Sequence, residues 1–454
     1  NAIGAGAFLA AAAFPTKGHR GAQTALGLGV TTTTLYFGAA DLWRDRVPRW
    51  SLTLPGDSYP VPSTVPVWIL LAATLLVGGV AALSRPNQEP GEPTDFDHPE
   101  ELRVLDPACG SGHFLLYAFD VLERIWRREC PRMDPGAIPR KILEHNLYGV
   151  DLDLRACQLA TFNLYLKARD RAESEGNTDF ELPRMGIVTA DAKVANTDDI
   201  SEIFEELSGD HDELEEALQT ILDSFENIEA LGTLLDAKGT LEDVFDTGEQ
   251  QTLMEAINGT GDLHSVLENL RQSVDDRFGD DSFDAQELRS FLRLLVILTQ
   301  DYDVALMNPP YGARGRMPKP VRDYVDEYWE YATEYYINFF EVCDQLSKDN
   351  GRVGMLVKRE FMFKNSLAEF RQDFIGERGS FDFLAELGEG VLDKAKVRNA
   401  ATVVRTSAQE QDEVKGSFFR LHDVPKGEKE EKLLDSVYKN PVDDGVQRVY
   451  TKEL

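Results

Sequence analysis

The chain has 454 residues, of which 42% are hydrophobic and 28% charged, a balance typical of a globular protein with a well-buried core. Its 79 acidic residues outnumber its 47 basic ones and give a formal net charge of -32. This total excludes a protein whose whole surface is a basic nucleic-acid footprint. Two interpretations stay open. Either the chain does not touch nucleic acid, or it works in concentrated salt, where an acidic surface stays hydrated and repulsion is screened. We favour the second, a halophilic source with a local basic patch.

The cysteines indicate the compartment. Cys109, Cys130, Cys157 and Cys343 have neither metal-ligand spacing nor the pattern of a small disulfide framework. We therefore expect no metal site, a reducing cytoplasmic environment and cysteines that act as small core residues.

Residues 1–85 form an apolar N-terminal region. Its clearest segment is Val67–Leu83, an uncharged run of about seventeen residues at the short limit for a bilayer span. Ala2–Phe14 and Gly21–Ala40 are further uncharged stretches. We expect membrane helices here, so that the protein would associate with a membrane through residues 1–85. The alternatives are a buried hairpin or an upstream piece unrelated to the rest. A Pro- and acid-rich linker follows at 86–100.

From Leu102 onward, expected strands alternate with expected helices. The strands are Leu102–Leu105, Leu147–Val150, Gly186–Thr189, Val304–Met307, Val353–Val357, Phe381–Glu386 and Ala401–Arg405, and the first helices are His113–Glu129 and Leu154–Ala168. This alternation predicts an α/β fold with a Rossmann-like, doubly wound, mostly parallel sheet. In such sheets, ligands bind at the carboxyl ends of the strands.

A long acidic block interrupts the alternation. The spacing of leucines and phenylalanines over Asp198–Gln300 predicts helices, so we expect an acidic helical insertion at 193–300, packed as a small bundle. Its charges are most simply a solvated face, with a binding site as the alternative.

A glycine-rich motif lies between the first strand and the first helix. Asp106 to Phe114 reads DPACGSGHF. Gly110 and Gly112 permit a tight turn and a close approach of the backbone to a ligand, and the helix N-terminus behind them suits a carboxylate or phosphate. The spacing differs from the GxGxxG of dinucleotide binding. A GxG alone could be a plain strand-to-helix turn, but the whole string in this context predicts a ligand site.

Two acidic residues follow the next two strands. Asp151, in YGVDLD, can accept hydrogen bonds from both hydroxyls of a ribose, and its alternative role is the N-cap of the following helix. Asp191, in TADA, can accept from an adenine amino group or can serve as a cap or turn residue.

A rigid corner follows the fourth strand, where Asn308, Pro309, Pro310 and Tyr311 read NPPY. The two prolines hold the turn so that the Asn308 side-chain oxygen and the Pro309 carbonyl are fixed acceptors. Acceptors for both N–H bonds make an exocyclic amine more pyramidal and more nucleophilic, which is electrostatic preorganisation. The Tyr311 ring can stack on a base turned out of a duplex. The alternative is a plain Pro-Pro turn.

The order DPACGSG, GVDLD, TADA and NPPY resembles an N6-adenine-specific DNA methyltransferase of the gamma arrangement. The similarity is greatest to the PglX-type methyltransferases of BREX phage-defence systems, and it extends to related fused restriction–modification enzymes. It is carried by three longer strings, DPACGSGHFLLYAFD, NLYGVDLDLRACQLATFNLYLKA and GRVGMLVKREFM. The resemblance covers about Glu101–Asp191 and Asp301–Thr406. It implies a sheet with an antiparallel last strand.

The resemblance also implies a cofactor, a substrate and roles for the motif residues. The cofactor would be S-adenosylmethionine and the partner double-stranded DNA with a flipped adenine, with other phage-defence proteins as further partners. The methionine part of the cofactor would be lined by Asp106, Pro107, Ala108, Gly110 and Gly112. Asp151 would hold its ribose, and Asp191 would contact its adenine. The target-adenine site would be formed by Asn308, Pro309, Pro310 and Tyr311. Phe339 or Phe340 would wall the same pocket.

The expected organisation follows from these motifs. After the N-terminal region and the linker come a cofactor-binding half at 101–192, the acidic insertion at 193–300, a catalytic half at 301–410 and the start of a truncated C-terminal region at 411–454. A cofactor-closing segment before the glycine motif, a target-recognition domain and a nuclease motif are not recognisable. Methylation of RNA or of a protein amide, and an inactive membrane-tethered scaffold, stay open as alternatives.

Overall fold

The computed structural model describes most of the chain after residue 97. The described residues are 53–54, 57–58, 98–190, 232–234, 236–239, 267–268, 271–272, 274, 283–310, 312–331, 333–391, 397–406, 417–429 and 431–433. The apolar segments expected in 1–85 lie outside these ranges. Among the helices within them, none has both the length and the apolar character that crossing a bilayer requires.

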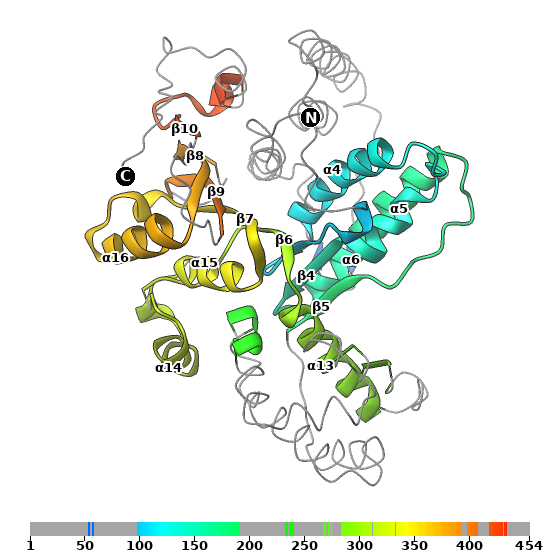
Figure 1. Cartoon of the computed structure of the whole chain (residues 1–454), viewed down its shortest axis with the longest axis horizontal. Helices are drawn as coiled ribbons and strands as arrows, with labels where there is room; N and C mark the ends of the chain where they lie inside the picture. The colour runs from blue at the N-terminus through cyan, green and yellow to red at the C-terminus, as the bar shows by residue number, and fades with distance from the viewer. Residues whose placement is uncertain are drawn as a thin grey trace. The chain divides into compact units, whose positions relative to one another are not determined.

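An eight-stranded sheet is the main feature of the described chain, in the order β10-β8-β9-β7-β6-β3-β4-β5 (Figure 1). Its strands are β3 (Val104–Asp106), β4 (Leu147–Asp151), β5 (Gly186–Thr189), β6 (Tyr302–Met307), β7 (Ser347–Lys358), β8 (Ser380–Gly388), β9 (Asn399–Arg405) and β10 (Ser417–Arg420). β3 pairs in parallel with β4 and β6, β4 with β5, and β8 with β10, whereas β9 is antiparallel to β8. The prediction of a mostly parallel sheet is confirmed. The last of the predicted strands, β9, is antiparallel to β8 as expected, and the additional strand β10 is parallel to β8. Separately, β1 (Thr53–Leu54) pairs antiparallel with β2 (Asp57–Ser58).

Each expected strand is present, and most of the strands extend beyond the apolar residues from which they were predicted. β10 was not predicted. It is a four-residue strand, Ser-Phe-Phe-Arg, that pairs with β8 at the end of the described sheet. A segment this short has no period that a sequence pattern could detect.

Helices connect the strands and flank the sheet. They are α4 (His113–Glu129), α5 (Ile138–Lys141), α6 (Leu154–Ser174), α13 (Phe283–Thr299), α14 (Lys319–Tyr328), α15 (Tyr335–Gln345) and α16 (Ala368–Phe370). Short 3-10 segments are η1 (Pro99–Glu101), η3 (Gly232–Leu234), η5 (Arg314–Arg316), η6 (Arg359–Met362), η7 (Asn365–Leu367) and η9 (Lys426–Glu428), and π segments are η2 (Ile142–Asn146) and η8 (Arg371–Arg378).

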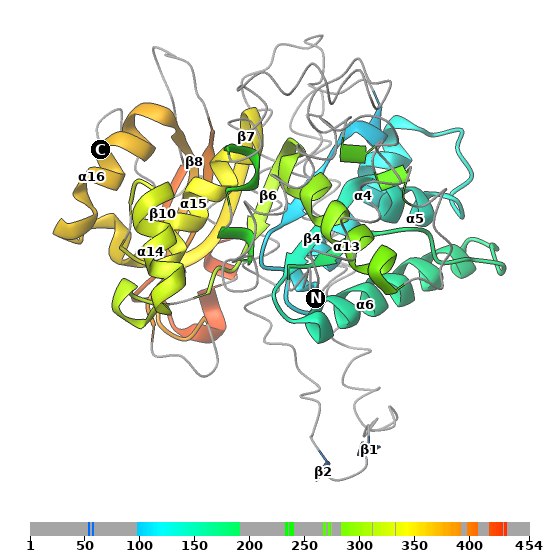
Figure 2. The same ribbon diagram turned by 90° about the horizontal axis from the view of Figure 1, so that it is seen from below.

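The end of the acidic block is a core helix. α13 packs against β5, as α6 does, and it leads directly into β6 (Figures 1 and 2). Its buried side chains include Leu288, Phe291, Leu292 and Leu295, each no more than 2% exposed. This part of 193–300 therefore belongs to the helices that cover the sheet, because its residues are far more apolar than the acidic sequence before it.

The chain forms two compact units. One consists of Glu100–Leu115 and Pro135–Val353, and the other of Asn1–Pro99, Leu116–Asp134 and Gly354–Leu454. All the described motif residues of the predicted site belong to the first unit.

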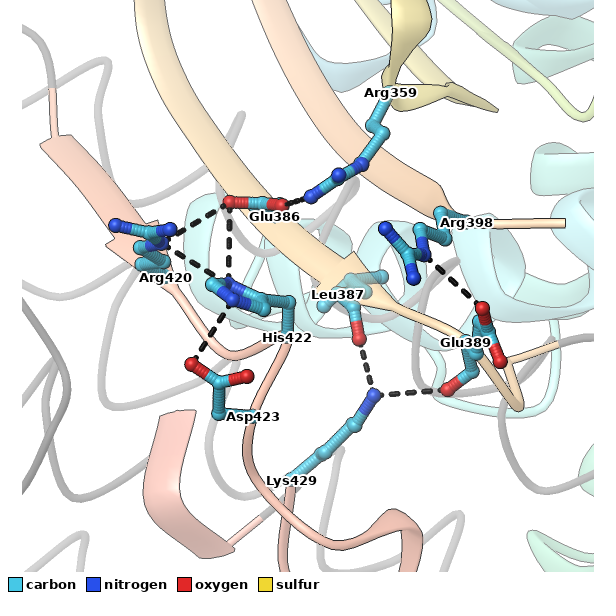
Figure 3. A network of polar contacts seen from close by, with 9 residues as sticks. All are labelled: Arg359, Glu386, Leu387, Glu389, Arg398, Arg420, His422, Asp423 and Lys429. Carbon is cyan, nitrogen blue, oxygen red and sulfur yellow. Dashed lines mark hydrogen bonds and ion pairs between the residues drawn. The ribbon is translucent and has the colours of Figure 1, made fainter.

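A polar network in the second unit ties β8 to its neighbours (Figure 3). Glu386 of β8 is 7% exposed and forms ion pairs with Arg359 and, at 3.5 Å, with Arg420. Its carboxylate also lies 3.5 Å from Nδ1 of His422. The ammonium group of the buried Lys429 donates to the carbonyls of Leu387 and Glu389. The loop after β10 is thus fixed to the end of β8 by charged groups that are mostly shielded from water.

Removing the Glu386 carboxylate should destabilise this unit. Glu386→Ala leaves Arg359 without its buried partner, so we expect the free energy of unfolding to fall by about 3 kcal/mol. Glu389→Gln is the matched control, because its side chain is 62% exposed and its ion pair with Arg398 is a surface pair, worth roughly 0.5 kcal/mol. Urea unfolding measures both variants. Equal losses would contradict the role assigned to Glu386.

Candidate active site

The glycine motif forms a tight turn between β3 and α4. Gly110 has φ of 51° and Gly112 φ of 81°, both in the left-handed region that favours glycine. A Cβ on Gly112 would lie 3.0 Å from the Cβ of Ala160 in α6, whereas a Cβ on Gly110 would meet no atom within 4 Å. The turn therefore packs against α6 through Gly112 and has open space beside Gly110.

The two glycines should respond differently to alanine. Gly110→Ala introduces only backbone strain, roughly 1–2 kcal/mol. Gly112→Ala adds a clash with Ala160, so we expect it to lower the free energy of unfolding by roughly 1–3 kcal/mol more. Chemical denaturation of the two variants in parallel measures the difference. Equal destabilisation would mean that the contact with α6 does not constrain the turn.

Asp151 links the end of β4 to the glycine turn. Its Oδ2 accepts a hydrogen bond from the Gly110 backbone N–H at 2.9 Å, and its Oδ1 accepts from the Asp153 N–H at 2.9 Å. The N-cap of α6 is Asp153, whose side chain accepts from the Arg155 N–H at 2.9 Å. The cap role considered for Asp151 therefore falls to Asp153. Each carboxylate oxygen can accept more than one hydrogen bond, so Asp151 keeps acceptor capacity for a ligand.

Asp106 is the last residue of β3 and is 1% exposed. Its Oδ1 accepts from the Ala108 N–H at 3.1 Å. Burial raises the pKa of the Asp106 carboxyl well above its usual value, and the negative charge of Asp151 raises it further, while the hydrogen bond from Ala108 acts in the opposite direction. A cationic group bound beside Asp106 would favour its ionised form.

The Asn308 corner follows β6. Asn308 is half-buried, Pro309 is buried and Pro310 is exposed, while Tyr311 lies outside the described residues. Asp191 also lies outside them. Phe339 and Phe340, the expected pocket walls, are buried in α15 at 5% and 0% exposure.

The sheet brings the glycine turn and the corner to the same edge. β3 and β6 are parallel neighbours, with Leu105 opposite Ala305. Asp106 and Met307 are the last residues of these strands. Neighbouring strands lie about 4.8 Å apart. Asn308 therefore leaves the sheet next to the glycine turn, as the predicted site requires.

Cys343 of α15 is fully buried beside the end of β6. Its Sγ is 3.7 Å from the Sδ of Met307. Burial raises the pKa of the Cys343 thiol, and the negative charge of Asp106 raises it further. α15 therefore packs this thiol against Met307, the last residue of β6.

The chain after the corner is held firmly. The Gly312 carbonyl accepts from the Tyr335 N–H at 3.0 Å, and a Cβ on Gly312 would lie 2.8 Å from the Tyr335 ring. The Arg314 N–H donates to the Thr333 carbonyl at 3.0 Å, and the Arg314 guanidinium forms a two-pronged ion pair with Asp326 of α14. Tyr335 is an aromatic residue beside the corner that the sequence did not single out.

A segment of the acidic region contacts the glycine motif. The Thr233 hydroxyl, in a side chain that is 5% exposed, donates to the Pro107 carbonyl at 2.8 Å. The neighbouring Leu234 carbonyl accepts from the Trp329 indole N–H at 2.8 Å. This segment therefore joins the cofactor motif to the chain between α14 and α15.

The same segment is fixed at its other end. The Asp236 N–H donates to the Tyr324 hydroxyl at 2.9 Å, and the Asp236 carboxylate accepts from the Gln345 amide at 2.5 Å. The sequence predicts a small helical bundle here with its charges on a solvated face, and it does not predict these contacts. The one available signal was a break in composition, since 230–235 contains no charged residue.

The mostly parallel sheet carries a glycine turn after β3, an acidic residue after β4 and an Asn-Pro-Pro corner after β6. This is the architecture of an S-adenosylmethionine-dependent methyltransferase. The family model described as Eco57I restriction-modification methylase matches residues 145–380, more than half of the chain. The chain belongs to this family. The model of the MmeI DNA-methyltransferase domain matches residues 97–192.

Curated relatives agree with this assignment. The chain is 27% identical over 360 residues to the adenine-specific methyltransferase PglX of Lacticaseibacillus casei (strain Zhang), an alignment that covers 75% of this chain and 26% of the relative. It is 27% identical over 364 residues to the adenine-specific methyltransferase BrxX of Escherichia coli O9:H4 (strain HS), covering 77% of this chain and 29% of the relative. The chain thus spans between a quarter and a third of the length of these relatives.

Among solved structures, the ATP-dependent Type ISP restriction-modification enzyme LlaBIII bound to DNA is similar to 78% of this chain. The similarity covers 20% of the LlaBIII chain, with 17% sequence identity and a TM-score of 0.44.

Proposed function

We propose that this chain transfers the methyl group of S-adenosylmethionine to N6 of adenine in DNA, within a restriction–modification or phage-defence system. The observation that carries the proposal is the parallel pairing of β3 with β6. This pairing sets the Asn308 corner beside the glycine turn, so a methyl donor and an amine acceptor can meet at one edge of the sheet.

The described residues suit the cofactor. Open space lies beside Gly110, and Asp151 has acceptor capacity toward a ribose. Asp106 is a buried carboxylate that a bound ammonium group would stabilise. When bound, S-adenosylmethionine supplies an electrophilic methyl group on a sulfonium. Pro107 and Ala108 would line its methionine part, and Asp191 would accept from its adenine.

The corner acts on the target base. The Asn308 side-chain oxygen and the Pro309 carbonyl accept the two N–H bonds of the adenine amino group, which draws its nitrogen lone pair out of the ring system. Pro310 keeps the turn rigid. Tyr311 stacks on the extruded base, so the amino group is held in a fixed orientation.

The proposed reaction also implies partners, a source and a location for the protein. The partner is double-stranded DNA from which the target adenine is flipped, and the defence role implies contact with further phage-defence proteins. A halophilic source would account for the net charge of -32. A membrane association would act through residues 1–85.

Methyl transfer to different acceptors tests the proposal. The protein is incubated with tritiated S-adenosylmethionine and with unmethylated duplex DNA, RNA or a protein mixture, over a range of salt concentrations. We expect label in the DNA alone. Label in RNA or protein, with none in DNA, would replace the proposed substrate, and no label in any acceptor would support the inactive scaffold.

A further inference from the structure

A short basic segment follows the Asn308 corner directly. Arg314, Arg316, Lys319 and Arg322 lie within 314–322, in a chain whose net charge is -32. Such a cluster runs against the composition of the whole protein. The four basic residues divide into two groups by their contacts.

Arg314 and Arg322 both act on the carboxylate of Asp326 in the protein itself. Arg314 holds Asp326 in the two-pronged ion pair, and Asp323 also lies near its guanidinium. The pKa of the Asp326 carboxyl is lowered, first by the hydrogen bond from Arg314 and also by the charge of Arg322. Arg314 therefore fastens the chain after the corner to α14, whereas Arg322 lies within α14 and acts on Asp326 of the same helix through its charge.

Arg316 and Lys319 are more exposed to solvent than Arg314 and Arg322. Both side chains are exposed, and within the described residues neither has an ion-pair partner. Lys319 begins α14, directly after Pro318. A cation at a helix N-terminus is unfavourable for the helix, because the helix dipole is positive there. An unfavourable placement of this kind indicates a role outside helix stability.

The backbone that carries these two cations forms a hydrogen-bonded turn. The Arg316 N–H donates to the Ala313 carbonyl at 2.8 Å, and the Met317 N–H donates to the Arg314 carbonyl at 3.1 Å. Met317, between the two cations, is buried at 4% exposure. Arg316 and Lys319 therefore flank a hydrogen-bonded turn whose Met317 side chain is buried, and this turn follows the corner closely in the chain.

We propose that Arg316 and Lys319 bind backbone phosphates of the DNA strand beside the extruded adenine. This inference rests on the proposed function and adds to it the surface that receives the strand. Phosphate contacts of this kind position the duplex without reading its sequence. An acidic protein needs such a local attraction at the point where a base must enter the site.

The test compares Arg316→Gln/Lys319→Gln with wild type in binding a fluorescent 30-base-pair duplex across a salt series. We expect the logarithmic salt slope of the affinity to shrink by about 1.8, and KM for DNA to rise roughly tenfold at moderate salt, because two phosphate contacts are lost. The kcat at saturating DNA and the affinity for S-adenosylmethionine should stay unchanged. The charge-preserving variant Arg316→Lys/Lys319→Arg should restore the slope.

The matched control removes two other exposed cations. Arg155→Gln/Arg169→Gln changes the net charge equally on α6, where both residues pair with neighbouring acids. If it lowered the slope as much as the first pair, or if Arg316→Gln/Lys319→Gln left the slope unchanged in a protein that still methylates DNA, this inference would be overturned and the proposed function would stand. A wild-type protein that neither binds nor methylates duplex DNA would overturn both.

Discussion

Asn308→Ala should reduce methyl transfer to DNA by about 100- to 1000-fold, the range seen when one preorganised polar group is removed from a reacting centre. The Asn308 side-chain oxygen is one of the two acceptors that we assign to the adenine amino group. Without it, the nitrogen lone pair stays delocalised in the ring. The affinity for S-adenosylmethionine should change little, because the glycine turn and Asp151 come from other strands. Single-turnover methylation and calorimetric cofactor titration measure the two quantities separately.

A thermal unfolding curve controls for damage to the fold. Asn308 is only half-buried and follows the end of β6, so we expect Asn308→Ala to unfold near the wild-type temperature. Wild-type turnover in Asn308→Ala would remove the corner from the mechanism. A parallel loss of cofactor affinity and turnover would instead assign Asn308 to cofactor binding.

Asp151→Ala should weaken the binding of S-adenosylmethionine by about 100-fold, because hydrogen bonds from a ribose to a charged acceptor are lost. The same substitution removes the acceptor of the Gly110 N–H. The glycine turn therefore loses an anchor at the side where the cofactor would bind. Calorimetric titration of S-adenosylmethionine measures this change.

Asp153→Ala is the matched control. It removes an acidic side chain two residues away and eliminates the N-cap of α6, which should lower the free energy of unfolding by about 1 kcal/mol. Its cofactor affinity should match wild type. Equal weakening in both variants would mean that Asp151 acts only through the local fold.

The sequence predicted the fold well where local signals are strong. The helix expected at His113–Glu129 and the strand expected at Gly186–Thr189 have those bounds in the structure. In both segments the apolar spacing is clear and glycine lies at the border. α14 and α15 were not predicted, although they hold the chain that follows the corner.

Much of the site depends on contacts between distant residues, which a single sequence does not reveal. The Thr233 hydroxyl reaches the Pro107 carbonyl across more than a hundred residues. The pairing of Asp151 with Gly110 and the cap at Asp153 were also settled only by geometry, since both aspartates suit either role. The sheet register places the glycine turn and Asn308 at the ends of neighbouring strands, and the roles assigned to the motif residues stay predictions.

Identification of the methylated nucleoside tests the central claim most directly. Unmethylated DNA is treated with the protein and S-adenosylmethionine, digested to nucleosides and separated by mass spectrometry, with Asn308→Ala alongside. We predict N6-methyldeoxyadenosine as the new product, and its near absence in the variant. Methylated cytosine, or N6-methyldeoxyadenosine at equal levels with and without Asn308, would contradict the account.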